Sequence, residues 1–206
     1  MRSFTMSDLS ATEKFATRLL YRAAGVDVEL AEGDLASIQV DAIVCPANNF
    51  LQMRGGLARD LRVKGGDSIE REAMNIGILD SGSAVITSAG RLPCRFIIHA
   101  PTVYRPMDTA SPLSITLATR AALECAEVNS IASVAIPALG TGTGAVSFDQ
   151  SALSILDQIR RTIDRGLAKV TRIVIVAYER EFYDAILSNL HVLTEVRRYE
   201  DRAAPP

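Results

Sequence analysis

The sequence predicts an α/β fold, a three-layer α/β/α sandwich in which helices cover both faces of a mixed, mostly parallel sheet of about six strands. Two observations predict it. Short apolar segments alternate along the chain with longer segments of helical periodicity, the order typical of parallel strands joined by crossover helices. Several apolar segments, such as residues 133–136 and 172–178, are apolar at successive positions, which indicates strands buried on both faces.

Six segments are predicted to be strands because they are short, apolar, partly β-branched and bounded by turn-forming residues. They cover residues 26–30, 41–46, 83–88, 95–99, 133–136 and 172–178. Pro46 and Pro101 are expected to end two of these strands, since proline has no N–H to give to a strand ladder.

The predicted helices follow apolar spacing and terminal signals. They cover residues 11–24, 57–64, 68–75, 112–129, 149–165 and 181–193. The first follows Ser10-Ala11-Thr12-Glu13, the pattern of a capping box, and precedes Gly25, a typical helix stop. We therefore expect residues 1–25 to be an N-terminal extension with a short helix, 26–196 to be one domain, and 197–206 to be a disordered tail.

Composition excludes several classes of protein. The chain of 206 residues has 48% hydrophobic residues and a formal net charge of -2, so it can bury a core and offers no basic face for nucleic acid. Its three scattered cysteines favour neither a disulfide framework nor a metal site. No secretory or membrane-spanning segment is evident. We expect a cytoplasmic location, no membrane partner and no cofactor.

A glycine loop, residues 137–145, follows the strand at 133–136, and helical periodicity resumes near Asp149. This order of strand, glycine loop and helix can present backbone N–H groups to a phosphate. The loop has neither the lysine of a P-loop nor the G-x-G-x-x-G spacing. A simple turn between strand and helix is the alternative.

Other polar or glycine-rich segments follow the carboxyl ends of predicted strands, where ligands of such sheets bind. They are Asp34, Asn48-Asn49 with Gly55-Gly56, His99-Ala100-Pro101, and Tyr178. We expect His99 to be a core histidine, Cys45 to lack a nucleophile–base pairing, and Arg59 and Lys64 to be solvated helix charges.

Over residues 26–190 the sequence resembles the macrodomain family of ADP-ribose-binding modules. The order and spacing of several motifs carry the resemblance. These motifs are Gly33-Asp34-Leu35, Asp41-Ala42-Ile43-Val44 with Ala47-Asn48-Asn49, Gly55-Gly56-Leu57-Ala58, residues 82–90, Phe96-Ile97-Ile98-His99-Ala100, and Ile136-Pro137-Ala138-Leu139-Gly140-Thr141-Gly142.

The resemblance implies a role for each matching position. Asp34 would accept the adenine 6-amino group, which favours adenine over guanine; the Leu35 amide would serve the same ring, and Tyr178 would stack on it. Asn48 would bind the distal ribose, and the two glycine loops would hold the diphosphate. The implied ligand-binding residues are Asp34, Leu35, Asn48, Gly55, Gly56, Leu57, Ala58, Pro137, Gly140, Thr141, Gly142, Thr143, Gly144, Ala145 and Tyr178.

Three of these positions have a local alternative. Asp34 could be an Asx-turn or helix-cap residue, Asn48 a turn asparagine, and Tyr178 an ordinary strand-end side chain that covers the core.

Some family members hydrolyse ADP-ribosyl bonds or deacetylate O-acetyl-ADP-ribose. One hydrolytic branch resembles this chain but carries an aspartate where Ala58 stands. Asp60, two positions later, is turned by roughly 200° on a helix. We therefore expect a protein that binds free or protein-linked ADP-ribose, with weak or substrate-assisted hydrolysis in which Asn48 only positions the substrate. The alternatives are a nucleotide-dependent oxidoreductase that grips a dinucleotide with the glycine loop, and a structural module without a ligand.

Overall fold

A computed structural model describes residues 16–142 and 146–194. Within them, seven strands form one sheet in the order β1-β2-β7-β6-β3-β5-β4. Every inner pair is parallel, and β1 and β4 join the edges antiparallel. The strands are β1 (Thr17–Ala23), β2 (Val26–Glu32), β3 (Ala42–Asn48), β4 (Val85–Ser88), β5 (Phe96–Val103), β6 (Ser133–Pro137) and β7 (Arg172–Ala177). The predicted mixed, mostly parallel sheet is confirmed, with one strand more than expected.

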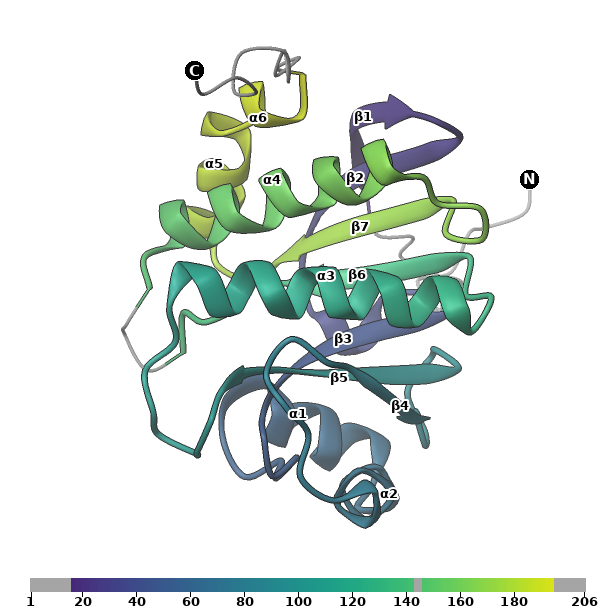
Figure 1. Ribbon diagram of the computed structural model, residues 1–206, viewed down its shortest axis with the longest axis vertical. Coiled ribbons are helices and arrows are strands. Elements are labelled where there is room, and N and C mark those ends of the chain that lie inside the picture. The colour runs from purple at the N-terminus through teal and green to yellow at the C-terminus, as the bar shows by residue number, and fades with distance from the viewer. Residues whose placement is uncertain (1–15, 143–145, 195–206) are drawn as a thin grey trace, which may run out of the picture.

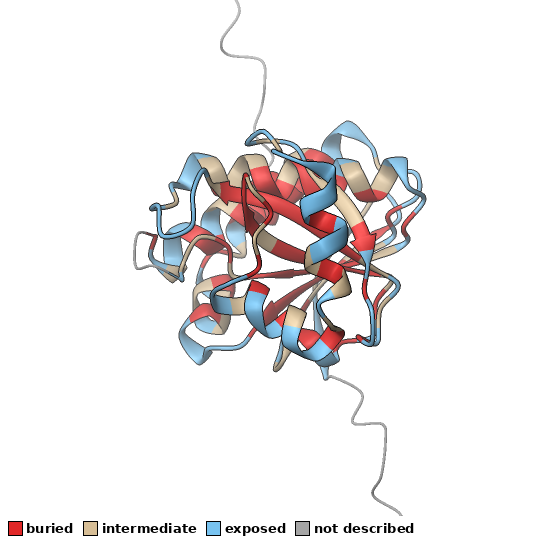
Figure 2. Cartoon of the chain, turned by 90° about the horizontal axis from the view of Figure 1, so that it is seen from below, coloured by how far each residue is buried: buried red, intermediate tan, exposed pale blue. Residues whose placement is uncertain are grey.

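Helices cover both faces of the sheet (Figure 1). They are the 3-10 helix η1 (Leu35–Ser37) and the α-helices α1 (Gly56–Gly65), α2 (Ser68–Ile76), α3 (Pro112–Val128), α4 (Phe148–Arg165), α5 (Arg180–Ser188) and α6 (His191–Thr194). Neighbouring strand residues face opposite layers: Ile97 packs in one buried cluster with Leu61 of α1, and Ile98 in another with Ala118 of α3. Figure 2 shows the buried strands between the two helical layers.

The N-terminal helix is a wrong prediction over residues 17–23, which form strand β1. β1 pairs antiparallel with β2. Between the two strands Ala24 and Gly25 have φ of 49° and 79°, which is the backbone of a tight hairpin turn that twists with its strands. Gly25 therefore closes a hairpin, and residues 17–23 belong to the sheet. Residues 11–15 of that predicted helix and the predicted tail, residues 197–206, lie outside the described residues.

The two prolines expected to end strands lie inside them, since β3 continues to Asn48 and β5 to Val103. The pairing explains why. β6 pairs with β3 only at Ala42 and Ile43, and β4 pairs with β5 only as far as His99. Pro46 and Pro101 lie beyond these contacts, so no ladder on that side requires their missing N–H.

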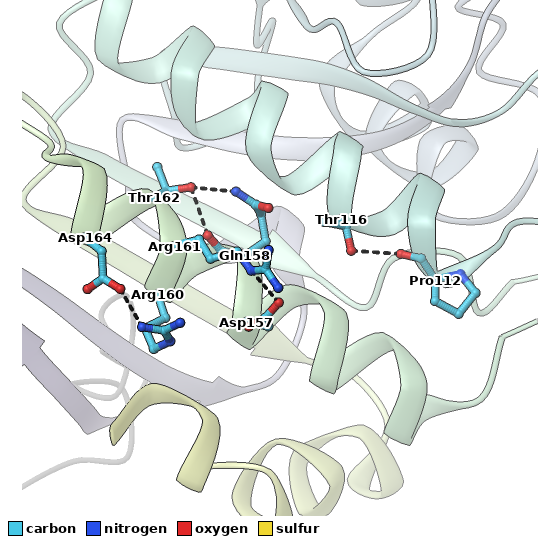
Figure 3. Close-up of polar contacts among 8 residues, drawn as sticks. All are labelled: Pro112, Thr116, Asp157, Gln158, Arg160, Arg161, Thr162 and Asp164. Carbon is cyan, nitrogen blue, oxygen red and sulfur yellow. Dashed lines mark hydrogen bonds and ion pairs between the residues drawn. The ribbon is translucent and has the colours of Figure 1, made fainter. Parts of the chain in front are cut away.

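The predicted helix 149–165 is confirmed as α4, which begins one residue earlier. Ser147 caps it, because its hydroxyl accepts from the Gln150 amide at 3.2 Å. Side chains also pair along the helix (Figure 3): Gln158 Nε2 donates to Thr162 Oγ1 at 2.9 Å. The helix that follows the second glycine loop therefore has a capped N-terminus.

The predicted helix 181–193 is two helices, α5 and α6, separated near Asn189. The Asn189 amide donates to Asp149 of α4 at 2.8 Å and to the Ala185 carbonyl at 2.9 Å. This side chain caps the end of α5 and ties it to α4, so the chain turns there instead of continuing.

His99 is a fully buried residue of β5, as expected for a core histidine. Its Nε2 lies 2.9 Å from Thr87 Oγ1 of β4. Burial lowers the pKa of His99 to about 4, and the nearby Glu72 carboxylate raises it only in part. The imidazole is therefore neutral in the folded protein at neutral pH.

We expect acid to destabilise the fold through His99. The pKa is 6.5 in its ordinary state and about 4 when folded, so the unfolded chain takes up a proton that the folded chain does not. This contribution is complete above pH 6.5 and is lost as the pH falls towards 4, at a cost of about 3 kcal/mol. Urea unfolding of wild type and His99→Gln at pH 7 and pH 4.5 measures it.

The matched control is His191→Gln, since the chain has two histidines and His191 is exposed. It should keep the acid sensitivity of wild type. Equal losses of stability with acid in wild type and His99→Gln would contradict the assignment to His99.

Candidate functional site

A cavity of about 1080 Å³ opens at the carboxyl edge of the sheet. It lies where β3 and β6 separate beyond Ile43, the point from which the chain leaves towards α1 on one face and α4 on the other. Most of the predicted site residues line it. They are Asp34, Leu35, Asn48, Gly55, Gly56, Leu57, Ala58, Pro137, Gly140, Thr141, Gly142 and Tyr178. The other three, Thr143, Gly144 and Ala145, lie outside the described residues.

The first glycine loop ends at the N-terminus of α1, which faces the cavity. Gly55 is the N-cap residue and has no side chain to cap the helix, and Gly56 has a φ of 50°. The first N–H groups of a helix have no acceptor within it and lie at its positive end. A Cβ at either glycine would meet nothing within 4 Å. An anion can therefore approach this backbone closely.

The second glycine loop, after β6, uses its glycines in two ways. Gly140 has a φ of 75°, and a Cβ there would lie 2.8 Å from Ile115 Cδ1 and 3.0 Å from Ala110 Cβ. Gly142, in contrast, has open space where a Cβ would stand. Gly140 lets the loop pack against α3, whereas Gly142 leaves its cavity side open.

Asn48 is buried at the end of β3 and organises the chain that follows. Its Oδ1 accepts from the Phe50 amide at 3.0 Å, and its Nδ2 donates to the Gln52 carbonyl at 2.9 Å. These bonds are those of a turn asparagine. An amide nitrogen has two N–H groups, so one donor of Asn48 is left for a ligand in the cavity.

Glu70 of α2 anchors the loop between Asn48 and α1. Its carboxylate accepts from the Met53 amide at 2.8 Å and from Arg62 Nη1 at 2.7 Å. Burial works to raise the pKa of Glu70, but the Met53 amide and the Arg62 guanidinium together lower it below its ordinary value. The ionised carboxylate therefore ties the first glycine loop to α2.

Asp34 precedes η1, and its carboxylate is held on two sides. Oδ1 accepts from the Ala36 amide at 2.9 Å, and Oδ2 accepts from Lys64 Nζ at 2.5 Å. Partial burial acts to raise the pKa of Asp34, but these two donors lower it on balance. Asp34 is thus a helix cap that also faces the cavity. Lys64 is an exposed helix charge, as expected, but it also pairs with Asp34.

Tyr178 follows β7 and is 76% exposed while it lines the cavity. A side chain that covered the core would be buried, so the alternative of an ordinary core-covering tyrosine is excluded. Its side chain is therefore accessible to a ligand in the cavity.

Sequence reasoning missed several residues of the cavity wall. They include Gln52, Arg54, Lys64, Thr102, Val103, Met107 and Glu179. Asp60 lines the cavity together with Ala58. The turn of roughly 200° between these two positions on a helix had predicted that they would face different sides. Helical spacing could have indicated one face of α1, because residues 57, 60 and 64 recur every three or four positions.

His99-Ala100-Pro101 does not reach the cavity, because β5 continues to Val103 and places Thr102 and Val103 there instead. Cys45 is fully buried, and burial raises the pKa of its thiol to about 12. Over residues 16–142 and 146–194, no three His, Cys, Asp or Glu side chains gather as a metal site needs. In the same ranges no helix has the length and apolarity to span a membrane.

A family model described as the Macro domain matches residues 44–155. An uncharacterized protein of Aquifex aeolicus is 38% identical over 160 residues, which cover 78% of this chain and 95% of that protein. Another, of Aeropyrum pernix, is 45% identical over 115 residues, or 56% of this chain and 61% of that protein.

Two solved structures share the fold. The Oceanobacillus iheyensis macrodomain with ADP has a TM-score of 0.75 at 22% identity, covering 87% of this chain and 97% of that one. The Trypanosoma brucei macrodomain in complex with ADP-ribose has a TM-score of 0.74 at 19% identity, covering 84% of this chain and 73% of that one.

Two glycines of the second loop, Gly140 and Gly142, should respond differently to substitution by alanine. Gly140→Ala adds a Cβ at positive φ against Ile115 and Ala110, so we expect a loss of about 1–3 kcal/mol in the free energy of unfolding. Gly142→Ala meets open space and should stay within about 0.5 kcal/mol of wild type. Urea unfolding measures both, and equal losses in the two variants would contradict this packing.

Proposed function

The chain belongs to the macrodomain family, and from this membership we propose that its cavity binds ADP-ribose, either free or as the terminal ADP-ribosyl group of a modified protein. One observation carries the proposal. Residues from the ends of β2, β3, β6 and β7 and from the start of α1 converge on one cavity, in the order in which family resemblance assigns them to adenine, ribose and diphosphate.

The diphosphate subsite is proposed to lie between the two glycine loops. The N-terminus of α1 supplies N–H groups and the positive end of a helix dipole. Gly56 and Gly142 both leave open space where a side chain would stand, so the phosphate oxygens can reach the main chain. This mode of binding suits a chain with a formal net charge of -2, because it needs no cluster of lysines or arginines.

The adenine is proposed to lie between Asp34 and Tyr178. The carboxylate of Asp34 is an acceptor for the 6-amino group, the Leu35 amide serves the same ring, and the exposed tyrosine offers a flat apolar face. The distal ribose would then reach Asn48, whose remaining N–H can donate to a hydroxyl. Two observations support this orientation of the ligand. The Ala36 amide holds the carboxylate of Asp34 in place, and Tyr178 is 76% exposed.

Hydrolysis of the ADP-ribosyl bond is a second candidate function. The observation that favours it is that both glycine loops, which could fix the diphosphate of the substrate, line one cavity. We propose slow hydrolysis in which a phosphate oxygen of the substrate assists the attacking water and the glycine loops hold the reacting geometry. Asp60 stands one helical turn beyond the N-terminus of α1, so it is not assigned as the base.

Stacking on Tyr178 should be measurable in an ADP-ribose titration. Tyr178→Ala removes the ring, and we expect affinity to fall about tenfold, or about 1.4 kcal/mol. Tyr178→Phe keeps the ring and should bind within about twofold of wild type. Calorimetry at constant salt is the measurement. An equal loss in both variants would assign the effect to the hydroxyl, and no heat with wild type would contradict the binding function.

The hydrolysis proposal can be checked with ADP-ribosylated protein as substrate. We expect slow release of ADP-ribose by wild type, and Asp60→Asn should keep the rate within about threefold because the substrate supplies its own base. Release is followed by chromatography, with Asp164→Asn, a distant carboxylate on α4, as the control. A loss of tenfold or more in Asp60→Asn alone would assign the base to Asp60 instead.

A further inference from the structure

The carboxylate expected to select adenine is paired with a lysine. We infer that Asp34 and Lys64 together recognise two purine edges, so that the cavity also accepts diphosphoriboses of 6-oxopurines such as hypoxanthine. This inference rests on the proposed function, since it concerns the base end of the same ligand. It revises the expectation that Asp34 favours adenine over a base with a carbonyl at position 6.

The pair forms a fixed polar edge inside the cavity. Lys64 Nζ, in the last turn of α1, lies 2.5 Å from Asp34 Oδ2, and both residues line the cavity. The Ala36 amide holds the other carboxylate oxygen. The two side chains are 48% and 37% exposed, so a ligand can reach both. An acceptor and a charged donor therefore stand side by side where a base edge would lie.

The two purine edges differ in the order of their donors and acceptors. Adenine presents a donor at its 6-amino group beside an acceptor at N1, whereas a 6-oxopurine presents an acceptor at O6 beside a donor at N1–H. A carboxylate alone offers only acceptors and repels O6. With Lys64 beside it, Asp34 can accept from the 6-amino group of adenine. For hypoxanthine it can accept from N1–H while Lys64 donates to O6.

A second carboxylate lies near Lys64 on the same helix. Asp60 lies four residues earlier on α1 and lines the same cavity, and side chains at this spacing are neighbours on a helix. When an adenine 6-amino group takes the Asp34 oxygen, Lys64 can turn towards Asp60 without losing an anionic partner. The lysine thus adapts to either base, and neither arrangement leaves its charge isolated.

The test compares ADP-ribose with inosine diphosphate ribose on the same protein by calorimetry. Wild type should bind the two within about fivefold of each other. Lys64→Met removes the donor and keeps the aliphatic length, and it should raise the ratio of the two dissociation constants about tenfold or more, mainly by weakening the inosine ligand. Lys64→Arg keeps a charged donor and should keep the ratio near that of wild type.

Arg59→Met is the matched control, because it removes the same charge from an exposed position of α1 outside the cavity wall. It should leave the ratio unchanged. The inference is overturned if Lys64→Met leaves the ratio within threefold of wild type, or if wild type binds the inosine ligand more than fiftyfold more weakly than ADP-ribose. If wild type binds neither ligand, the proposed function itself fails.

Discussion

The separation of β3 and β6 is the constraint on which the site depends. The two strands pair only at Ala42 and Ile43, and beyond that point the chain leaves β3 towards α1 on one face and β6 towards α4 on the other. Both glycine loops therefore begin at the same gap in the sheet. A cavity at this position follows from the strand order, because the connections after β3 and β6 lead to helices on opposite faces of the sheet.

Charge is arranged locally in this cavity. On its wall Lys64 pairs with Asp34, and the formal net charge of the chain is -2. A bound diphosphate would be held by backbone N–H groups and a helix dipole, which act over the length of one turn. Long-range attraction would add little, so binding should depend far less on salt than it does in proteins with a basic patch.

Much of this arrangement could be predicted from the sequence, and what could not has identifiable physical causes. Periodicity located six of the seven strands, and most of the glycine and polar segments after them line one cavity, although His99-Ala100-Pro101 does not. β1 was missed because Gly25 fits a helix stop as well as a hairpin turn, and only pairing with β2 distinguishes them. The contact of Lys64 with Asp34 joins residues 30 positions apart, and no local pattern contains it.

Acid should affect the stability of the fold and the charge of Asp34 differently. The pKa of Asp34 lies below its ordinary value of 3.8, so its carboxylate stays mostly ionised as the pH falls from 6.5 to 4. Over the same pH interval the free energy of unfolding falls, because the unfolded chain takes up a proton on His99 that the folded chain does not. Any weakening of ligand binding between these pH values should therefore mainly follow the loss of folded protein, since Asp34, the proposed acceptor for the base, stays mostly ionised.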